Sequence, residues 1–194
     1  MKDKIPLNVA EDVAKEFIKK IADVCDRVEI AGSVRRRKET VGDVEICCVP
    51  KMGKARGAGL FADTELVTVN LLDERMQKLL SLSQAISPGD KAKNGRKAPF
   101  SERYYKFRYA GYPFDLFCVI APRQWGIIYC IRTGPKEYSH WIVTHAWTKN
   151  KRCVEGELLD LKNDMARIPC PEEIDFYRAL ELEYVEPEKR VAPM

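Results

Sequence analysis

The sequence predicts an α+β fold in two parts, a larger unit over residues 1–122 and a smaller one over residues 123–194. Three observations lead to this prediction. An amphipathic helical pattern opens the chain, apolar strand-like runs follow near residues 41–50 and 104–120, and helical patterns return after Pro122. Pro122-Arg123 breaks the pattern and marks the expected boundary.

In the first unit, residues 9–24 repeat apolar side chains at helical spacing, so we expect a helix with one buried face. A short strand is expected next, and Gly32-Ser33 is expected to open a turn or a short helix. The further elements that we expect in this unit are a strand at 41–50, a loop at 51–59, a helix at 64–82, a basic loop at 87–100 and a hairpin at 104–109 and 114–120.

The second unit should begin with two helices, at 124–131 and 136–149, joined at Thr133-Gly134-Pro135. Residues 153–169 read as irregular with short strands, and 172–182 as a last helix. The unit is therefore a small α+β layer of its own.

Composition narrows the possible settings of the protein. The chain has 194 residues, 45% of them hydrophobic, and a net charge of +4. No apolar run is long enough to span a bilayer, and no signal sequence is evident. The seven cysteines lack metal-ligand spacing, so Cys47, Cys48 and Cys118 should be buried free thiols in a reducing, cytoplasmic setting. Of three basic clusters, at 35–38, 91–97 and 149–152, we expect at least one to contact a nucleic-acid backbone.

The most informative stretch runs from Gly32 to Glu45. Gly32-Ser33 supplies a tight turn with a backbone N–H group and a hydroxyl for phosphate. Asp43 and Glu45 stand two apart in a strand-like segment, so both carboxylates project from one face. They repel each other unless a cation lies between them, and Mg²⁺ prefers oxygen ligands and keeps substrate phosphates in its shell. The pattern predicts metal-assisted nucleotidyl transfer.

This stretch resembles the nucleotidyltransferase superfamily that includes DNA polymerase beta, whose signature is a Gly-Ser turn followed by an acidic-apolar-acidic strand. Arg35-Arg36 and Thr40-Val41-Gly42 look more specifically like the family X DNA polymerases. The resemblance implies a nucleotidyltransferase palm, with a mixed or antiparallel sheet and helices on one face, followed by a thumb-like subdomain. We expect a minimal palm-plus-thumb form, of viral or prokaryotic type.

Asp115 is the only charged residue in the apolar run around it, and a buried carboxylate needs a partner. The partner could be a lysine or an N–H group, which would make Asp115 structural. It could instead be a metal ion shared with Asp43 and Glu45. The resemblance favours the metal, because family X polymerases carry a third catalytic carboxylate on such a strand.

The second unit also resembles this family, in the segment from Trp125 to Tyr138 and in the closing Glu-Pro of residues 186–187. The chain departs from the family pattern at Glu45, Ile131, Arg132, Pro135, Ser139 and Val143. Glu45 changes the ligand reach, and Pro135 should preserve a sharp turn, which in the family often contains a cis peptide. The other changes leave sugar discrimination and template dependence open.

The resemblance implies two Mg²⁺ ions, with Mn²⁺ as a substitute, held by Asp43, Glu45 and Asp115. It assigns the β- and γ-phosphates to Gly32, Ser33, Arg36 and Gly42. It assigns the nucleoside to Thr133, Gly134 and Tyr138, although a core role for Tyr138 is nearly as well supported. Arg35 is expected to be structural or to contact the nucleic-acid backbone, and not to bind the triphosphate.

The predicted function is therefore transfer from a nucleoside triphosphate to a nucleic-acid 3′-hydroxyl, in short-gap DNA repair synthesis. The partners would be gapped or primer–template DNA and a protein that supplies further DNA grip; no membrane partner is expected. One alternative is a template-independent transferase that acts on RNA 3′ ends or on protein. Another is a non-catalytic nucleic-acid-binding module. Retention of all three carboxylates argues against the second alternative, because clustered like charges without metal destabilise a fold.

Overall fold

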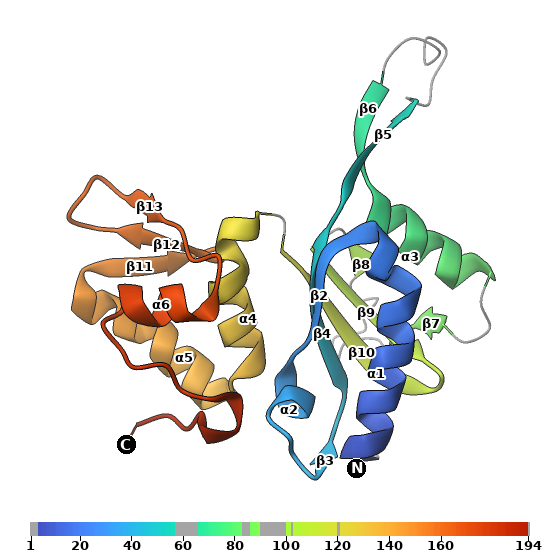
Figure 1. The fold of residues 1–194 in the computed structure, drawn as a ribbon, viewed down its shortest axis with the longest axis horizontal. Helices are drawn as coiled ribbons and strands as arrows, with labels where there is room; N and C mark the ends of the chain where they lie inside the picture. Colours follow the sequence, from blue (N-terminus) through green and yellow to red (C-terminus); the bar gives the residue numbers. More distant parts are fainter. Residues whose placement is uncertain are drawn as a thin grey trace, which may run out of the picture.

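The computed structural model describes residues 4–56, 66–82, 86–89, 100–101, 103–119 and 121–193. Figure 1 shows two parts side by side, a sheet-centred part formed by the first half of the chain and a smaller part formed by the second. We call them the palm and the thumb. The predicted basic loop at 91–97 lies outside the described residues.

Helix α1 (Leu7–Ile21) begins directly after Pro6, and the short 3₁₀ helix η1 (Ala22–Val24) extends it. Its buried residues recur at helical spacing, and Phe17 at their centre stacks against Phe107, Tyr109 and Phe114 at 5.0–5.4 Å between ring centroids. The helix predicted at 9–24 is confirmed. Its apolar stripe fixes α1 on the sheet.

The palm sheet has the strand order β2-β4-β10-β9-β7, with β8 paired to β9. Among the strands of this sheet that the structure describes, only β4 and β10 pair in parallel, so the sheet is mixed, as predicted. The bounds are β2 (Cys25–Ile30), β4 (Val44–Pro50), β7 (Ile86–Pro88), β8 (Phe100–Ser101), β9 (Tyr104–Tyr109) and β10 (Tyr112–Cys118). The predicted hairpin is confirmed as β9 and β10, and part of the segment predicted as a loop at 87–100 pairs as β7.

Two predictions in the palm were wrong. The segments predicted as a loop at 51–59 and as the start of a helix at 64–82 contain strands β5 (Met52–Arg56) and β6 (Leu66–Asn70), which pair as an antiparallel ribbon. Helix α3 (Leu71–Leu82) starts only after that ribbon. The Asn70 side chain accepts hydrogen bonds from the backbone N–H groups of Leu72 and Asp73 and so caps the helix. In an uninterrupted helix over 64–82, Asn70 would lie within the helix and could not cap its N-terminus.

The predicted strand at 41–50 is also divided. Thr40–Val41 forms β3, which pairs with β1 (Ile5–Pro6), and β4 begins at Val44. The break falls at Gly42 and Asp43. Asp43 therefore lies directly before the first residue of β4, outside the regular strand.

The two faces of the palm sheet are covered differently. Helices α1 and α3 pack with the side chains of Ile46, Cys48 and Leu116 into the larger core. On the other face, Cys47, Val49 and Phe117 pack against the first turns of helix α4 in the thumb. Glu45 and Asp115 lie on this second face, because they alternate with the residues of the first core.

The thumb packs three helices with a small sheet around a separate core. Its elements are η2 (Pro122–Gln124), α4 (Trp125–Thr133), α5 (Lys136–His145), η3 (Ala146–Lys149), β11 (Lys151–Val154), β12 (Glu157–Asp160), β13 (Ala166–Ile168), α6 (Glu173–Ala179) and η4 (Pro187–Lys189). In the segment predicted as irregular with short strands, the strands are confirmed, and they pair as a regular three-stranded antiparallel sheet. The last helix is shorter than predicted, and a reciprocal cap between Glu172 and Asp175 sets its start.

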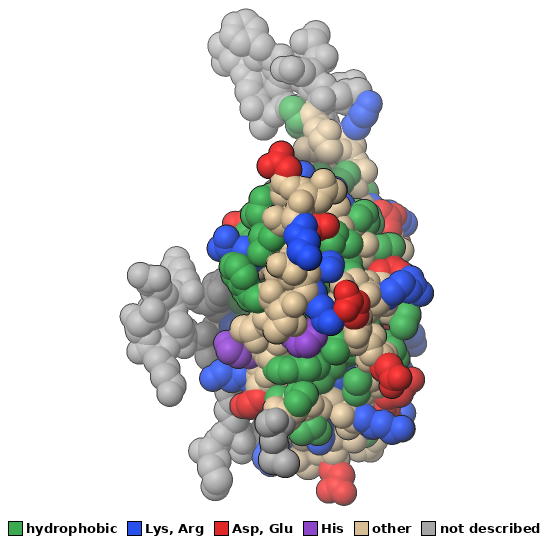
Figure 2. All heavy atoms as spheres, turned by 90° about the vertical axis from the view of Figure 1, so that its left-hand side faces the viewer, with side chains coloured by type: hydrophobic (Ala, Val, Ile, Leu, Met, Phe, Trp, Pro, Cys, Tyr) green, Lys and Arg blue, Asp and Glu red, His purple; other side chains and the backbone are tan. Residues whose placement is uncertain are grey.

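The cysteines follow the sequence prediction. Cys47, Cys48 and Cys118 are at most 6% exposed, and all seven thiols are free. Within the described residues, no helix is both long enough and apolar enough to cross a membrane. Acidic and basic side chains are interspersed over the thumb end of the molecule (Figure 2).

Candidate active site

The phosphate turn predicted at Gly32 lies directly against Glu45. Gly32 has a φ of +62°, and a Cβ atom added there would lie 1.9 Å from Glu45 Oε2. The Ala31 N–H group donates to the Glu45 carbonyl at 2.8 Å, which fixes the turn to strand β4. Any side chain at position 32 would displace the Glu45 carboxylate, so glycine is required for both conformation and space.

Strand pairing brings the predicted carboxylates together. Asp115 and Glu45 are register partners on the parallel strands β10 and β4, and Asp43 lies two residues before Glu45. Burial, and then the neighbouring charges of Asp43 and Asp115, raise the pKa of Glu45 to about 7. The three side chains therefore act on one another electrostatically, although they come from two segments of the chain.

The donor set fits a hard cation. Three carboxylates supply oxygen ligands, and a divalent ion would relieve the repulsion that raises the Glu45 pKa. As they stand, no three acidic, cysteine or histidine side chains in the described part of the chain are arranged closely enough to hold a metal. Asp115 Oδ1 instead accepts a hydrogen bond from the Tyr104 hydroxyl at 2.9 Å and lies 3.4 Å from Lys106 Nζ.

Sequence reasoning had not found Tyr104 and Lys106. A detectable signal existed, because a hairpin turning at 110–111 places Lys106 directly opposite Asp115. Tyr104 then shares that face of β9, two residues away. Lys106 is thus the lysine partner that the sequence left open for Asp115, and the Tyr104 hydroxyl binds the same carboxylate oxygen.

Arg36 lies between the carboxylates and the thumb. Its guanidinium donates to the Thr133 carbonyl, and its Nε has no hydrogen-bond partner among the described residues. Burial lowers the pKa of Arg36, partly offset by the attraction of Glu45. One guanidinium N–H group of Arg36 thus links the palm to the thumb, and its buried Nε–H group makes no hydrogen bond within the described part of the chain.

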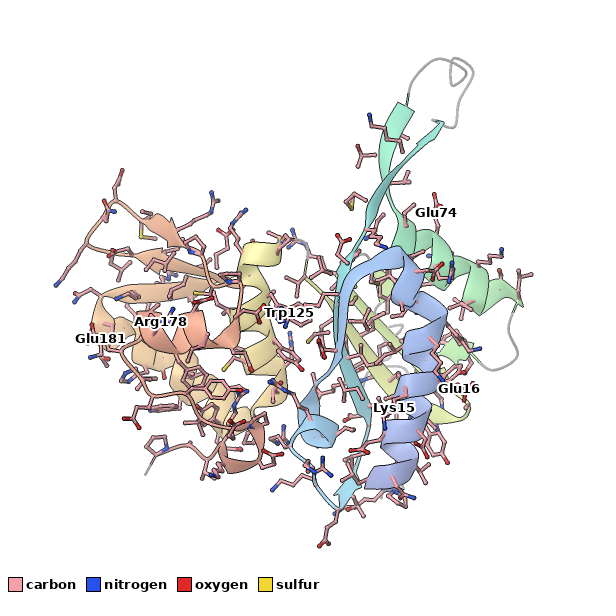
Figure 3. All side chains as sticks on the ribbon, in the orientation of Figure 1. Lys15, Glu16, Glu74, Trp125, Arg178 and Glu181 are labelled. Atoms are coloured by element: carbon pink, nitrogen blue, oxygen red, sulfur yellow. The ribbon has the colours of Figure 1, made fainter. Side chains whose placement is uncertain are left out.

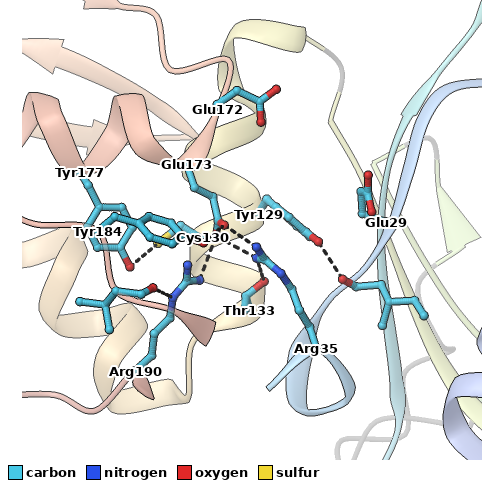
Figure 4. A network of polar contacts seen from close by, with 12 residues as sticks. Glu29, Arg35, Tyr129, Cys130, Thr133, Glu172, Glu173, Tyr177, Tyr184 and Arg190 are labelled. Atoms are coloured by element: carbon cyan, nitrogen blue, oxygen red, sulfur yellow. Dashed lines mark hydrogen bonds and ion pairs between the residues drawn. The ribbon is translucent and has the colours of Figure 1, made fainter. Parts of the chain in front are cut away.

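Arg35 joins the palm to the thumb, as Figure 4 shows. It makes two hydrogen bonds to the Glu173 carboxylate at 2.6 and 3.0 Å and one to Thr133 Oγ1 at 2.7 Å, and it stacks over the Tyr129 ring at 3.8 Å. Arg190 donates to the same carboxylate at 2.8 Å. The expectation that Arg35 is structural agrees with these contacts.

The residues predicted to contact the nucleoside are placed unequally. Thr133 is fully buried, and its hydroxyl and carbonyl are occupied by Arg35 and Arg36. Tyr138 is 2% exposed and shares a hydrogen bond of 2.7 Å with the Tyr177 hydroxyl, so its environment is that of a core residue. Gly134 is half-buried at the end of α4. The bond before Pro135 is trans, because the described part of the chain contains no cis peptide.

The molecule thus combines a mixed sheet that carries acidic residues on two paired strands with a smaller α+β unit, a palm-plus-thumb arrangement. Residues 129–191 match a family model described as DNA polymerase beta thumb. Two solved structures of polymerase beta from Leishmania infantum have this fold. A ternary gap complex is 18% identical with a TM-score of 0.71, covering 97% of this chain and 71% of that one.

A ternary P/T complex of the same protein is 19% identical with a TM-score of 0.65, covering 97% of this chain and 77% of that one. A search of curated proteins found no match. The chain thus has the fold of these polymerase beta structures, and its residues 129–191 match the model of the polymerase beta thumb.

Proposed function

We propose that this protein is a metal-dependent nucleotidyltransferase that extends the 3′ end of DNA from deoxynucleoside triphosphates, in short-gap repair synthesis. The convergence of three carboxylates beside a phosphate turn carries the proposal. The fold of polymerase beta supports it. Residues 1–122 would form the catalytic palm and residues 123–194 the thumb.

Asp43 and Glu45 would hold two Mg²⁺ ions, and Asp115 would complete one of the two sites. Such ions lower the pKa of the attacking hydroxyl and stabilise the attacking and leaving oxygens. Lys106 and Tyr104 keep Asp115 on the reactive face until that ligation, since both bind one of its oxygens. The bound ions would also stabilise the ionised form of Glu45, whose pKa is raised to about 7.

Gly32, Ser33, Gly42 and Arg36 would bind the triphosphate. An arginine fork binds phosphate oxygens at well-defined angles, and Arg36 already has one donor without a partner. Triphosphate binding would draw Arg36 away from the Thr133 carbonyl. Nucleoside contact would fall to the half-buried Gly134, since Thr133 and Tyr138 are both buried.

A one-nucleotide-gapped duplex tests this proposal. With Mg²⁺ and single triphosphates, we expect addition of the complementary deoxynucleotide alone, and chelation by EDTA should stop it. Triphosphate binding without any addition, under every metal condition, would leave only a nucleotide-binding module and overturn the proposal.

One observation favours a template-independent transferase acting on RNA ends or on protein. Val143, at the position of a template-contacting arginine in the family, packs against the thumb core and offers no cation there. Addition of one triphosphate irrespective of the opposing base, or of ribonucleotides to single strands, would support this second function.

A further inference from the structure

We propose that Lys106 is a positioning residue that moves from Asp115 to a phosphate of the acceptor strand when divalent ions bind. The phosphate is the one nearest the 3′ end of that strand. The inference rests on the proposed function, because it concerns the acceptor of the same reaction. It goes further by assigning to one side chain the coupling between metal binding and acceptor binding.

Without metal, Lys106 pairs with Asp115 across two neighbouring strands. The two residues are register partners on β9 and β10, and Lys106 Nζ lies 3.4 Å from Asp115 Oδ1. The Lys106 side chain is 32% exposed. An ion pair that is open to solvent on one side contributes little to stability. Lys106 can therefore leave at low cost once another charge compensates the carboxylate.

The surroundings of Lys106 allow its side chain to move while Asp115 stays in place. The side chains directly before and after Lys106 are at most 1% exposed, so the backbone of β9 is anchored in the larger core. The Tyr104 hydroxyl donates to the same Asp115 oxygen at 2.9 Å, and the Tyr104 ring stacks on Phe117 at 4.9 Å. Tyr104 thus continues to hold Asp115 after Lys106 has left.

Metal binding removes the attraction that holds Lys106. Asp43, Glu45 and Asp115 carry at most three negative charges together, and the two divalent ions of the proposed function carry four positive charges. The loaded cluster therefore repels the Lys106 ammonium group, because charges of like sign are then in contact distance. The ammonium group is on a flexible four-carbon stem and can turn to another anion nearby.

The strand order indicates which anion this is. Strand β10 lies between β4 and β9, so Lys106 is on the opposite side of Asp115 from Glu45 and the turn at Gly32. The triphosphate of the proposed function would occupy that turn, which leaves the β9 side for the acceptor. A strand whose 3′-hydroxyl lies at Asp115 has its nearest phosphate only one sugar away. Arg108 shares the less buried face of β9 with Lys106 and continues the positive charge away from Asp115.

The test measures binding of two fluorescent duplexes by anisotropy, with Mn²⁺ or with EDTA and without triphosphate. Both duplexes have a recessed 3′ end, and one carries a neutral methylphosphonate at the last linkage of the recessed strand. With Mn²⁺, the wild type should bind the unmodified duplex about tenfold tighter, because the modified duplex lacks the charged partner of Lys106. In EDTA, where Lys106 stays on Asp115, the two affinities should differ less than about twofold.

Two substitutions of Lys106 separate this role from a structural one. Lys106→Met should bind both duplexes equally, within about twofold, also with Mn²⁺. Lys106→Arg should keep most of the preference, since its guanidinium also binds phosphate. Without DNA, Lys106→Met should bind Mn²⁺ about threefold tighter, because a competing positive charge is absent. Electron paramagnetic resonance of free Mn²⁺ measures this, and a purely structural lysine would not change it in this direction.

Lys15→Met is the matched control, because it also removes one positive charge. Lys15 lies on α1, which covers the other face of the palm sheet (Figure 3), and its side chain is 61% exposed. It should keep the tenfold preference of the wild type. A preference that survives in Lys106→Met would overturn the proposal. Weaker triphosphate binding by Lys106→Met, with duplex binding unchanged, would also overturn it.

The same measurements separate this inference from the proposed function, because they need metal but no chemistry. A wild type that binds no Mn²⁺ would overturn both. A preference that depends on Mn²⁺ and on Lys106, in a protein that adds no nucleotide to the gapped duplex, would support the inference and count against the proposed function alone.

Discussion

Glu45 and Glu173 are both largely buried carboxylates, yet their surroundings are opposite. Glu45 lies beside two further carboxylates, and burial together with their charge raises its pKa to about 7. For Glu173, burial also acts to raise the pKa, but hydrogen bonds from Arg35 and Arg190 outweigh it and hold the pKa below its ordinary value. The surroundings of Glu45 disfavour its negative charge, and the surroundings of Glu173 stabilise its negative charge.

We interpret the cluster around Glu45 as a ligand site and the cluster around Glu173 as a structural link. A compensated buried carboxylate holds two elements together, here α2 (Gly32–Arg35) and α6. A cluster of carboxylates that repel one another costs stability, and a bound cation would relieve that cost. Four substitutions test this assignment.

Asp43→Asn should have the largest effect, on activity alone. Removal of the carboxylate that we propose to hold both ions should lower kcat at least about 10³-fold, which corresponds to about 4 kcal/mol. The melting temperature without metal should not fall, because a repulsive charge is removed. Primer extension and thermal unfolding measure the two effects, with the exposed Asp26→Asn as control. Turnover like that of the wild type would remove Asp43 from the metal site.

Glu173→Ala should have the opposite profile. It leaves Arg35 and Arg190 buried without their carboxylate, so we expect a loss of about 3 kcal/mol in the free energy of unfolding. Because the Glu173 pKa is lowered, its stabilising effect is present above the unfolded pKa and is lost as the pH falls through the folded value. Urea titration at pH 7 and at acidic pH checks this.

The matched control for Glu173→Ala is Glu181→Ala, which breaks an exposed pair with Lys149. It should cost less than about 1 kcal/mol. Equal destabilisation by the two variants would show that the buried carboxylate is not the main link between palm and thumb.

Arg36 lies near both Glu45 and the Glu173 cluster. Glu45 raises the pKa of Arg36, and Arg190, which binds Glu173, lowers it. Arg36→Ala should raise the KM for triphosphate about tenfold or more, because a hydrogen bond between charged groups contributes about 1.5–3 kcal/mol. kcat should change less. Steady-state kinetics over a range of triphosphate concentrations checks this, and an unchanged KM would move the phosphate site elsewhere.

Glu45→Gln should have the smallest effect, and of the opposite sign. Since the folded pKa of Glu45, about 7, lies above the ordinary glutamate pKa of 4.5, the metal-free protein loses stability as the pH rises between these values. The variant escapes this loss, so at pH 8 we expect it to be about 1–2 kcal/mol more stable than wild type, with no gain at pH 4. Added Mg²⁺ should stabilise wild type but not the variant. A gain that is independent of pH would contradict the assignment.

The sequence was sufficient where the information is local. The turn at Gly32 and the carboxylates at Asp43 and Glu45 lie within one short stretch, and the pairing of β9 with β10 depends on an adjacent turn. The sequence was insufficient for the β5–β6 ribbon. Its two strands have patterns that resemble a loop and a helix, and only their pairing with each other shows that they are strands. Burial of Tyr138 was also hidden, because it depends on packing against Tyr177 in another helix.

The link through Glu173 could not have been predicted at all. Arg35 and Glu173 are 138 residues apart, and an Arg-Arg pair beside a phosphate turn does not reveal which arginine turns towards the thumb. The roles of the three carboxylates remain predictions, although the structure brings these residues together.

The parallel pairing of β4 with β10 has a consequence for the order in which the molecule matures. Seventy residues separate paired positions on these strands, so closing that loop is among the slower steps by which the palm folds. A nascent chain that ends before β10 already contains the turn and two carboxylates, but Asp115 has not been synthesised. The proposed carboxylate site is therefore completed in one late step, when β10, at the centre of the sheet, pairs with β4.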